Sequence, residues 1–322
     1  MIYRSIGTIP DNFGPCALTI GNFDGVHAAH RHIMRRVVEI ARAHGWNAAV
    51  LTFDPHPTKL VAPDRAPHLL TTPERRSERM QDVGIDRILI LPFTPDIAKL
   101  TPEEFVRDIL VEKLQARAVL VGDNFRFGNR ASGNTATLKE LGERYGFETE
   151  IAGAIRLRGR TVSSSDIRKL IEAGNVALAC RLLERPYALE GKVAKGHGIG
   201  TKQTVPTLNL ETAAEVLPAT GVYVTRTQDL EAHQKWNSIT NVGFRPTFDG
   251  VGLTIESYLL SPFMGATPNQ IRVEFLHRIR EERKFPSAEA LKAQIMRDVG
   301  RAQVFFRRTE SLRPRDVAVH TN

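Results

Sequence analysis

The stretch GNFDGVHAAH, residues 21–30, lies where the apolar run ALTI at 17–20 gives way to a helical pattern over 31–44. The same alternation of a short apolar run with a helical pattern continues through the first half of the chain. Further apolar runs lie at 48–53, 87–91, 118–122 and 147–151, and further helical patterns at 73–83, 102–114 and 136–145. Such alternation is typical of βαβ units, whose helices cover both faces of a parallel sheet. We therefore predict a Rossmann-like α/β domain.

The stretch 21–30 has the composition of an anion-binding loop. In an open parallel sheet, ligands bind outside the carboxyl ends of the strands, where the next helix presents free N–H groups and a partial positive charge. Gly21 and Gly25 permit tight turns, while His27 and His30 lie three apart on one face of the starting helix. This pattern favours a polyphosphate ligand. A structural histidine pair is one alternative and a zinc site another, but the HExxH zinc pattern needs histidines four apart with a glutamate between them.

Three other polar stretches lie at the ends of predicted strands or the starts of predicted helices, namely TFDPHP (52–57), VGDNFRFGNRASG (121–133) and VSSSDIRKL (162–170). In the last of these, hydroxyl and amide groups at a helix start, with Arg168 in the first turn, indicate another anion site. Taken alone, SSSD is also what an ordinary helix cap looks like. The recurrence of such loops at equivalent positions favours one shared ligand site.

The texture of the sequence changes after Arg185-Pro186, which ends the last helical pattern of the first half. Short β-rich runs separated by turn residues follow at 187–195, 221–227, 237–243, 253–260 and 270–279. They predict an antiparallel barrel or sandwich, followed by a helix over Ser287–Arg308 that Ser287 caps. The expected divisions are a domain at 1–185, a domain at 186–309 and a disordered tail at 310–322.

The composition limits the class of protein. A chain of 322 residues, 42% hydrophobic and 25% charged, is long enough for two domains with real cores. No apolar run approaches the length that spans a bilayer, and the first residues lack the pattern of a signal peptide, so we expect a cytoplasmic protein with no membrane partner. Cys16 and Cys180 match no metal-ligand spacing, and we expect core or neutral positions for them rather than a disulfide.

The net charge of +8 and the pI near 9.7 suit either a nucleic-acid partner or anionic nucleotides. The basic clusters RRSERM (75–80) and HRIREERKF (277–285) carry glutamates between their arginines, without interleaved aromatic residues for base stacking. We interpret both clusters as solvated mixed-charge faces, which disfavours nucleic acid as a partner.

The ordered motifs of the first half resemble those of the bacterial bifunctional riboflavin kinase/FAD synthetase family, and the resemblance extends from about residue 14 to residue 308. GNFDGVHAAH is similar to the family's GxFDGxHxGH nucleotidyltransferase signature, TFDPHP matches its second motif, and VGDNFRFG and VSSSDIR resemble its third and fourth. The resemblance implies an FMN adenylyltransferase domain that transfers AMP from ATP to FMN. The site residues it implies are Gly21, Phe23, Asp24, Gly25, Asn124 and Ser164 for ATP binding, with His27, His30 and Arg168 as catalytic residues. Ala29 replaces the family's glycine, and we expect its methyl group to weaken ATP binding.

The second half resembles the riboflavin kinase part of the same family. GKVAKGHGIGTKQTVPTLNL (191–210) is similar to the segment that contains PTAN, and NVGFRPTF, IESYLL and VEFLHRIREERKF align with later motifs. The roles implied by the resemblance are Glu256 as catalytic base, Thr207 and Asn209 as ligands of magnesium and nucleotide, Gly196 in ATP binding, and Arg280 and Glu282 in flavin binding. Without the resemblance, PTLN fits a turn after a strand and Glu256 an exposed strand residue.

The same half also departs from the family pattern. Thr201 and Thr204 stand where the family has arginine and glycine, and Ser261-Pro262 replaces an acidic residue, which predicts a slower kinase step. The resemblance implies an enzyme that takes riboflavin, FMN and ATP as substrates, makes FMN and FAD, and uses Mg²⁺. One alternative is an FAD synthetase whose weakened kinase domain mainly binds flavin, and another is a basic nucleic-acid-binding protein.

Overall fold

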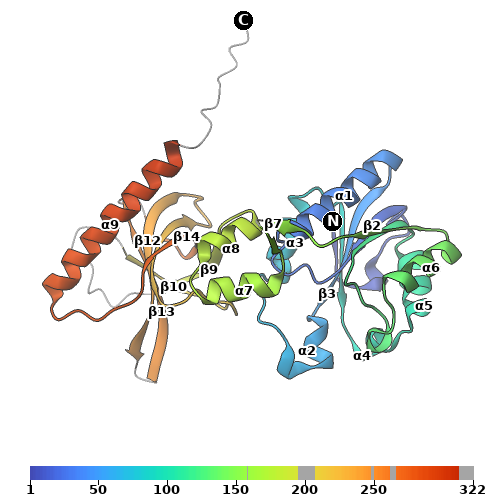
Figure 1. Cartoon of the computed structure of the whole chain (residues 1–322), viewed down its shortest axis with the longest axis horizontal. Helices are drawn as coiled ribbons and strands as arrows, with labels where there is room; N and C mark the ends of the chain where they lie inside the picture. Colours follow the sequence, from blue (N-terminus) through green and yellow to red (C-terminus); the bar gives the residue numbers. More distant parts are fainter. Residues whose placement is uncertain (158, 195–206, 248–249, 262–265, 312–322) are drawn as a thin grey trace, which may run out of the picture. The chain divides into compact units, whose positions relative to one another are not determined.

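The computed structural model describes residues 1–157, 159–194, 207–247, 250–261 and 266–311 (Figure 1). These residues form two compact units, which divide between Asp166 and Ile167. The division comes before the change of sequence texture at Pro186, because two helices that precede the β-rich half pack with it. In one of them the Cys180 thiol donates a hydrogen bond to the carbonyl of Phe275 at 3.2 Å. The boundary between residues 185 and 186, which we predicted from the change in sequence pattern, stays a prediction.

The first unit is built on a six-stranded parallel sheet with the strand order β1-β4-β3-β2-β5-β6. Its strands are β1 (Ile2–Tyr3), β2 (Cys16–Ile20), β3 (Asn47–Asp54), β4 (Arg87–Pro92), β5 (Ala116–Gly122) and β6 (Glu148–Ala152). A separate short hairpin pairs β7 (Arg156–Leu157) with β8 (Arg160–Thr161). From β2 the chain winds outward through β3 and β4, then returns to place β5 on the other side of β2. The order of winding therefore reverses beside β2.

Helices cover both faces of this sheet, as predicted. They are α1 (Ala28–His44), α2 (Pro57–Val61), α3 (Pro73–Gln81), α4 (Pro95–Lys99), α5 (Pro102–Glu104) with a π-helical continuation (Phe105–Lys113), and α6 (Thr135–Tyr145). Short 3₁₀ turns lie at Ile6–Thr8, Pro63–Arg65 and Asn129–Ala131. Met34 and Met80, from α1 and α3, belong to one buried cluster, while Leu110 and Leu138 belong to a second cluster with other side chains of the sheet. The two clusters confirm the α/β architecture.

The second unit is a closed antiparallel barrel with the strand order β10-β13-β12-β11-β14-β9, and α7 (Ser164–Glu172) and α8 (Val176–Leu183) precede it. Its strands are β9 (Tyr187–Ala194), β10 (Thr207–Glu211), β11 (Gly221–Asp229), β12 (Lys235–Thr247), β13 (Gly250–Leu259) and β14 (Gln270–Arg280). The barrel interior carries a chain of hydroxyl groups. Five fully buried side chains are joined by hydrogen bonds of 2.7–2.9 Å in the order Thr227, Ser238, Thr225, Thr240, Ser257.

The C-terminal helix α9 (Ala288–Ser311) packs on the outer face of the barrel (Figure 1). Ala302 and Phe306 of α9 are buried in a cluster with side chains of β11 and β12. The Ser287 hydroxyl accepts a hydrogen bond from the N–H of Ala290 at 3.2 Å, which confirms the predicted cap. The predicted tail begins at residue 310, but α9 continues through Ser311, so the first two residues of that tail are helical. Residues 312–322 lie outside the described residues.

Both cysteines are free thiols in the structure. Cys16 is fully buried and donates to the carbonyl of Leu114, and burial raises the pKa of its thiol to about 12. Burial also raises the pKa of the Cys180 thiol. Cys16 therefore occupies a core position, while Cys180 is half-buried, which fits the expectation of core or neutral positions. In the described parts of the chain, no helix is both long enough and apolar enough to cross a membrane.

Candidate active sites

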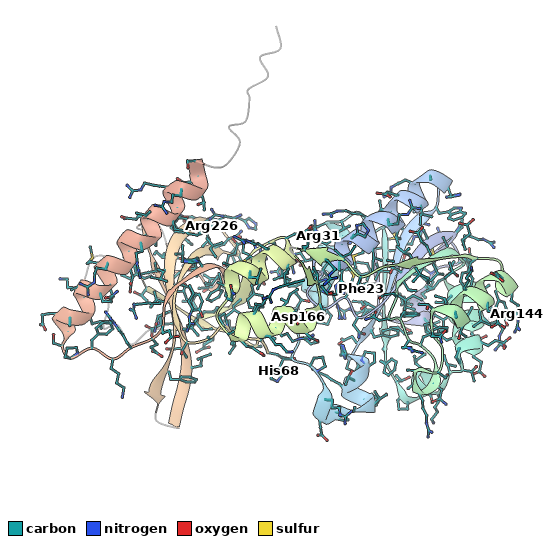
Figure 2. All side chains as sticks on the ribbon, viewed as in Figure 1. Phe23, Arg31, His68, Arg144, Asp166 and Arg226 are labelled. Carbon is teal, nitrogen blue, oxygen red and sulfur yellow. The ribbon has the colours of Figure 1, made fainter. Side chains whose placement is uncertain are left out.

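The loop of residues 21–27 joins β2 to α1 at the carboxyl edge of the parallel sheet. It lies where the winding order reverses, the place at which open α/β sheets bind their ligands. Gly25 has a φ of 80°, which favours glycine, and a Cβ on Gly21 would lie 3.1 Å from the ring of Phe23. Phe23 is itself buried on this loop, and Figure 2 labels it together with Arg31 of α1. The sequence 21–27 thus forms a compact turn at the expected ligand position.

His27 and His30 come together at the N-terminus of α1. Nδ1 of His27 accepts a hydrogen bond from the backbone N–H of His30 at 3.4 Å and so caps the helix. The two imidazole rings stack, with centroids 3.5 Å apart and planes 19° apart. Because Nδ1 of His27 is an acceptor, the neutral ring carries its proton on Nε2, which is then a hydrogen-bond donor. The pair stands at a helix end whose partial positive charge favours an anion.

Asp24 has a different environment from the one expected of a ligand-facing carboxylate. Its side chain is only 2% exposed and accepts hydrogen bonds from the N–H groups of Leu70 and Thr71, at 2.9–3.1 Å, and from the Thr71 hydroxyl at 3.2 Å. The N–H of Gly25 donates to the same Thr71 hydroxyl at 3.1 Å. These contacts tie the loop after β2 to the segment that leads into α3. The buried Asp24 carboxylate therefore stabilises the conformation of the loop.

The second motif adjoins the first one directly. Thr52, near the end of β3, donates its hydroxyl proton to the carbonyl of Asn22 at 3.2 Å. The Asn22 amide lies 2.9 Å from Nε2 of His56, whose Nδ1 accepts from the N–H of Thr58 at 3.3 Å. His56 therefore caps α2 with one ring nitrogen and meets the loop after β2 with the other. The expected convergence of GNFDG and TFDPHP is present in the structure.

Asn124 and Ser164 occupy a loop and a helix start in the first unit. Asn124 is exposed in the turn after β5, the neighbour of β2 in the sheet. The Ser164 hydroxyl donates to the carbonyl of Asp24 at 2.9 Å, which connects the fourth motif to the first. Ser163 accepts from the N–H of Asp166 at 3.1 Å, so the ordinary helix-cap interpretation of SSSD holds for this serine. Arg168 lies one residue beyond the first turn of α7 and falls in the second unit.

One residue of the RRSERM cluster is not solvated as predicted. Arg75 and Arg79 form ion pairs with acidic residues three positions on along α3, which agrees with a mixed-charge face. Arg76 is only 2% exposed and donates to two backbone carbonyls at the strand ends. Sequence reasoning missed it because an arginine between charged neighbours looks like a surface residue. Its spacing of four from the buried Met80 is the one signal that could have placed it on the inner face.

The barrel brings the predicted kinase residues onto one transverse row. Asn209 of β10 is the cross-strand partner of Glu256 in β13, and Glu256 is also the partner of Asn241 in β12. Glu256 lies between Ile255 and Ser257, both of which are buried and face the interior, so its side chain faces outward. Thr207 is two residues before Asn209 on the same face and is exposed. Sequence reasoning missed Asn241, which only the strand register identifies.

Glu282 approaches this row from the segment after β14. A Cβ built on Gly243 would lie 2.8 Å from the carboxyl carbon of Glu282 and 3.0 Å from Nδ2 of Asn241. The exposed Glu282 carboxylate therefore lies over Gly243, beside the residue that pairs with Glu256. The predicted flavin-side glutamate and the predicted base thus border one region of the outer barrel surface.

Arg280 is held by structural contacts. Its Nε donates to Asp298 of α9 at 2.9 Å, and Asp298 is only 1% exposed. The same carboxylate accepts from the Gln294 amide at 2.8 Å. The solvated face predicted for HRIREERKF is therefore wrong at Arg280, because this charge fastens α9 to the barrel. The predicted positions Gly196, Thr201, Thr204 and Pro262 lie outside the described residues.

Comparison with known families divides the chain in the same way as its motifs. The FAD synthetase family model matches residues 9–166, and the riboflavin kinase family model matches residues 183–306. Escherichia coli strain K12 has a bifunctional riboflavin kinase/FMN adenylyltransferase that is 35% identical over 291 residues, covering 90% of this chain and 93% of the relative. The enzyme of the same description from Pseudomonas fluorescens is 36% identical over 295 residues, covering 91% and 94%.

A solved structure extends the similarity to the fold. A crystal structure from Streptococcus pneumoniae, described as a macrolide-efflux protein, has a TM-score of 0.83 at 26% sequence identity. The match covers 94% of this chain and 98% of that protein.

Proposed function

The chain belongs to the family of bifunctional riboflavin kinase/FMN adenylyltransferases, and from this premise we propose which of its residues serve each reaction. The protein phosphorylates riboflavin to FMN with ATP and transfers AMP from a second ATP to FMN, which gives FAD and pyrophosphate. Riboflavin, FMN and ATP are therefore its substrates. We assign the adenylyl transfer to the loops of the first unit and the phosphorylation to the outer face of the barrel.

The observation that carries the first assignment is the stacked histidine pair at the N-terminus of α1. Adenylyl transfer is an in-line displacement at the α-phosphorus, in which the FMN phosphate attacks and pyrophosphate leaves. The protein has to place hydrogen-bond donors where negative charge grows, and no covalent nucleophile is needed. Nε2 of His27, the ring of His30 and the N–H groups of α1 provide such donors at one helix end. Asn124 and Ser164 belong to the same proposed ATP site, and Arg168 is the catalytic residue that the family resemblance implies for this reaction.

For the kinase step, the cross-strand pairing of Glu256 with Asn209 is the main support. Glu256 orients the 5′-hydroxyl of riboflavin and accepts its proton as the oxygen attacks the γ-phosphorus and ADP leaves. Asn209 and Thr207 face the phosphates of ATP from the adjacent strand. Glu282 contacts the flavin side of the substrate. Arg280 acts on this site indirectly, by holding the middle of α9 to β14 through Asp298.

The donor set on this face fits Mg²⁺. Within the described residues no group of three or more histidine, cysteine, aspartate or glutamate side chains could hold a metal ion. The hydroxyl of Thr207, the amide oxygen of Asn209 and the carboxylate of Glu256 are nonetheless hard oxygen donors, the kind that Mg²⁺ takes alongside substrate phosphates. When bound there, Mg²⁺ neutralises charge on the phosphate oxygens. We propose Thr207 and Asn209 as its protein ligands. A cytoplasmic location remains our proposal, supported by the need of both reactions for ATP.

The experiment that tests these assignments measures FMN and FAD separately for two variants. Glu256→Gln keeps size and hydrogen bonding but removes the base, so FMN formation should fall by about a hundredfold or more while FAD formation from supplied FMN persists. His30→Ala should do the reverse. Loss of FAD formation from FMN in folded Glu256→Gln, or loss of FMN formation in folded His30→Ala, would overturn the two-site assignment. FAD made only from supplied FMN by the unmodified protein would instead support the weakened-kinase alternative.

A further inference from the structure

Arg76 of α3 joins the ends of two neighbouring strands. Its Nη1 donates to the carbonyl of Asn22 at 2.8 Å, and its Nη2 donates to the carbonyl of Phe53 at 3.1 Å. Asn22 follows β2, and Phe53 is the penultimate residue of β3. Because a guanidinium group is planar and rigid, its two donors fix the distance between their acceptors. Arg76 therefore sets the spacing between the loop that carries His27 and the loop that carries His56.

The loop after β2 needs such support, because its backbone is strained. Phe23 and Val26 have φ angles of 49° and 39°, a region that aromatic and β-branched residues rarely adopt. A strained conformation of this kind persists only where the surroundings over-determine it. Here the loop is held at Asn22 by Arg76 and at Asp24 by the segment before α3. Helix α3 and the segment that precedes it thus form hydrogen bonds with the histidine-bearing loop at two points.

Fold stability alone does not account for a guanidinium at this position. Arg76 is 2% exposed, donates only to neutral carbonyls, and its buried Nε has no hydrogen-bond partner. Burial lowers the pKa of this guanidinium, although Asp24, Asp54 and Glu74 oppose the shift. A buried charge without a directly bonded counter-ion is costly, and neutral donors would satisfy the two carbonyls without burying a charge. What the guanidinium adds is the fixed bridge between two loops.

We propose that Arg76 is a positioning residue for adenylyl transfer, which holds the histidine-bearing loop in register with the TFDPHP loop. The proposal rests on the assignment of adenylyl transfer to these loops. It requires the shape of the guanidinium as well as its charge, because only a two-donor fork spans both carbonyls. Lysine at this position keeps the charge but loses the fork.

The test compares Arg76→Lys with Arg79→Lys, a matched substitution on the same helix. Arg79 pairs with Asp82 at the surface, and its change should leave both reactions as they are. Arg76→Lys should lower kcat/KM for ATP in FAD formation by about 10- to 100-fold, in the range expected for a misplacement of about 1 Å, with a raised KM for ATP. FMN formation by the same protein serves as an internal control and should not change.

Chemical rescue separates positioning from mere folding. In Arg76→Ala, guanidinium chloride at concentrations below those that unfold the protein should restore part of FAD formation, whereas ammonium chloride should not. Wild-type kinetics for Arg76→Lys, or equal losses in both reactions, would overturn the proposal, and so would a failure of guanidinium to rescue folded Arg76→Ala. If Arg76→Lys impairs FAD formation while His30→Ala does not, the proposed role of the histidines is wrong, and the proposed positioning role of Arg76 is supported.

Discussion

Replacing Gly243 by alanine should slow the kinase reaction by moving Glu282. The added Cβ would lie 2.8 Å from the carboxyl carbon of Glu282, whereas non-bonded carbon atoms prefer about 3.5 to 4.0 Å. The carboxylate therefore has to move by about 1 Å. Since Glu282 is exposed and its chain is flexible, the shift should cost less than about 1 kcal/mol of stability. A displacement of this size at a substrate-positioning group lowers turnover by up to about a hundredfold.

The assay follows FMN and FAD formation in Gly243→Ala, with thermal melting as a check on folding. FMN formation should fall, and FAD formation from supplied FMN should stay at the wild-type level. A double-mutant cycle with Glu282→Gly tests the route, because the two changes should not add if the effect of Gly243→Ala passes through the Glu282 carboxylate. Unchanged kcat and KM for riboflavin in Gly243→Ala would refute the placement of Glu282 in the flavin site.

Three further predictions concern other parts of the molecule. Ala29→Gly should lower the KM for ATP in FAD formation and leave FMN formation unchanged, since the methyl group it removes stands in the first turn of α1. Asp298→Ala removes the carboxylate partner of the partly buried Arg280 and should cost the barrel unit about 1.5 to 3 kcal/mol in chemical denaturation. Despite partial burial, hydrogen bonds from Arg42 and a backbone N–H lower the pKa of Asp86. Its stabilisation is thus present above about pH 4 and lost as the pH falls through the lowered pKa, so Asp86→Asn should be less stable than wild type by up to about 1 kcal/mol at pH 7 and match it near pH 2.

The fold was largely predictable because its periodicities are local. Alternation of apolar runs with helical patterns fixed the parallel sheet and its flanking helices, and Ser287 marked the start of the last helix. The edge strand β1 was not predicted, since a two-residue strand has no periodicity to detect. The placement of α7 and α8 with the barrel was equally hidden, because it depends on contacts such as that of Cys180 with Phe275.

The candidate sites were predictable in their motifs but not in their internal roles. His27 and His30 stand at a helix start as expected. The same motif contains Asp24, whose carboxylate accepts hydrogen bonds that stabilise the loop. For Arg76 the spacing of four from Met80 was the one signal in the sequence, and for Asn241 there was none. The first depends on which face of α3 turns inward, and the second on a strand register that sets it opposite Glu256.

The hydroxyl chain inside the barrel should make some of its positions more tolerant of substitution during evolution than others. Ser238, Thr225 and Thr240 each take part in two of its hydrogen bonds, while Thr227 and Ser257 take part in one. Valine at a middle position removes the hydrogen bonds of two buried hydroxyl groups, whereas valine at either end removes the hydrogen bond of only one. Drift toward an aliphatic interior should therefore begin at the two ends and proceed inward, one neighbour at a time, so that residues on β11, β12 and β13 change together across related sequences.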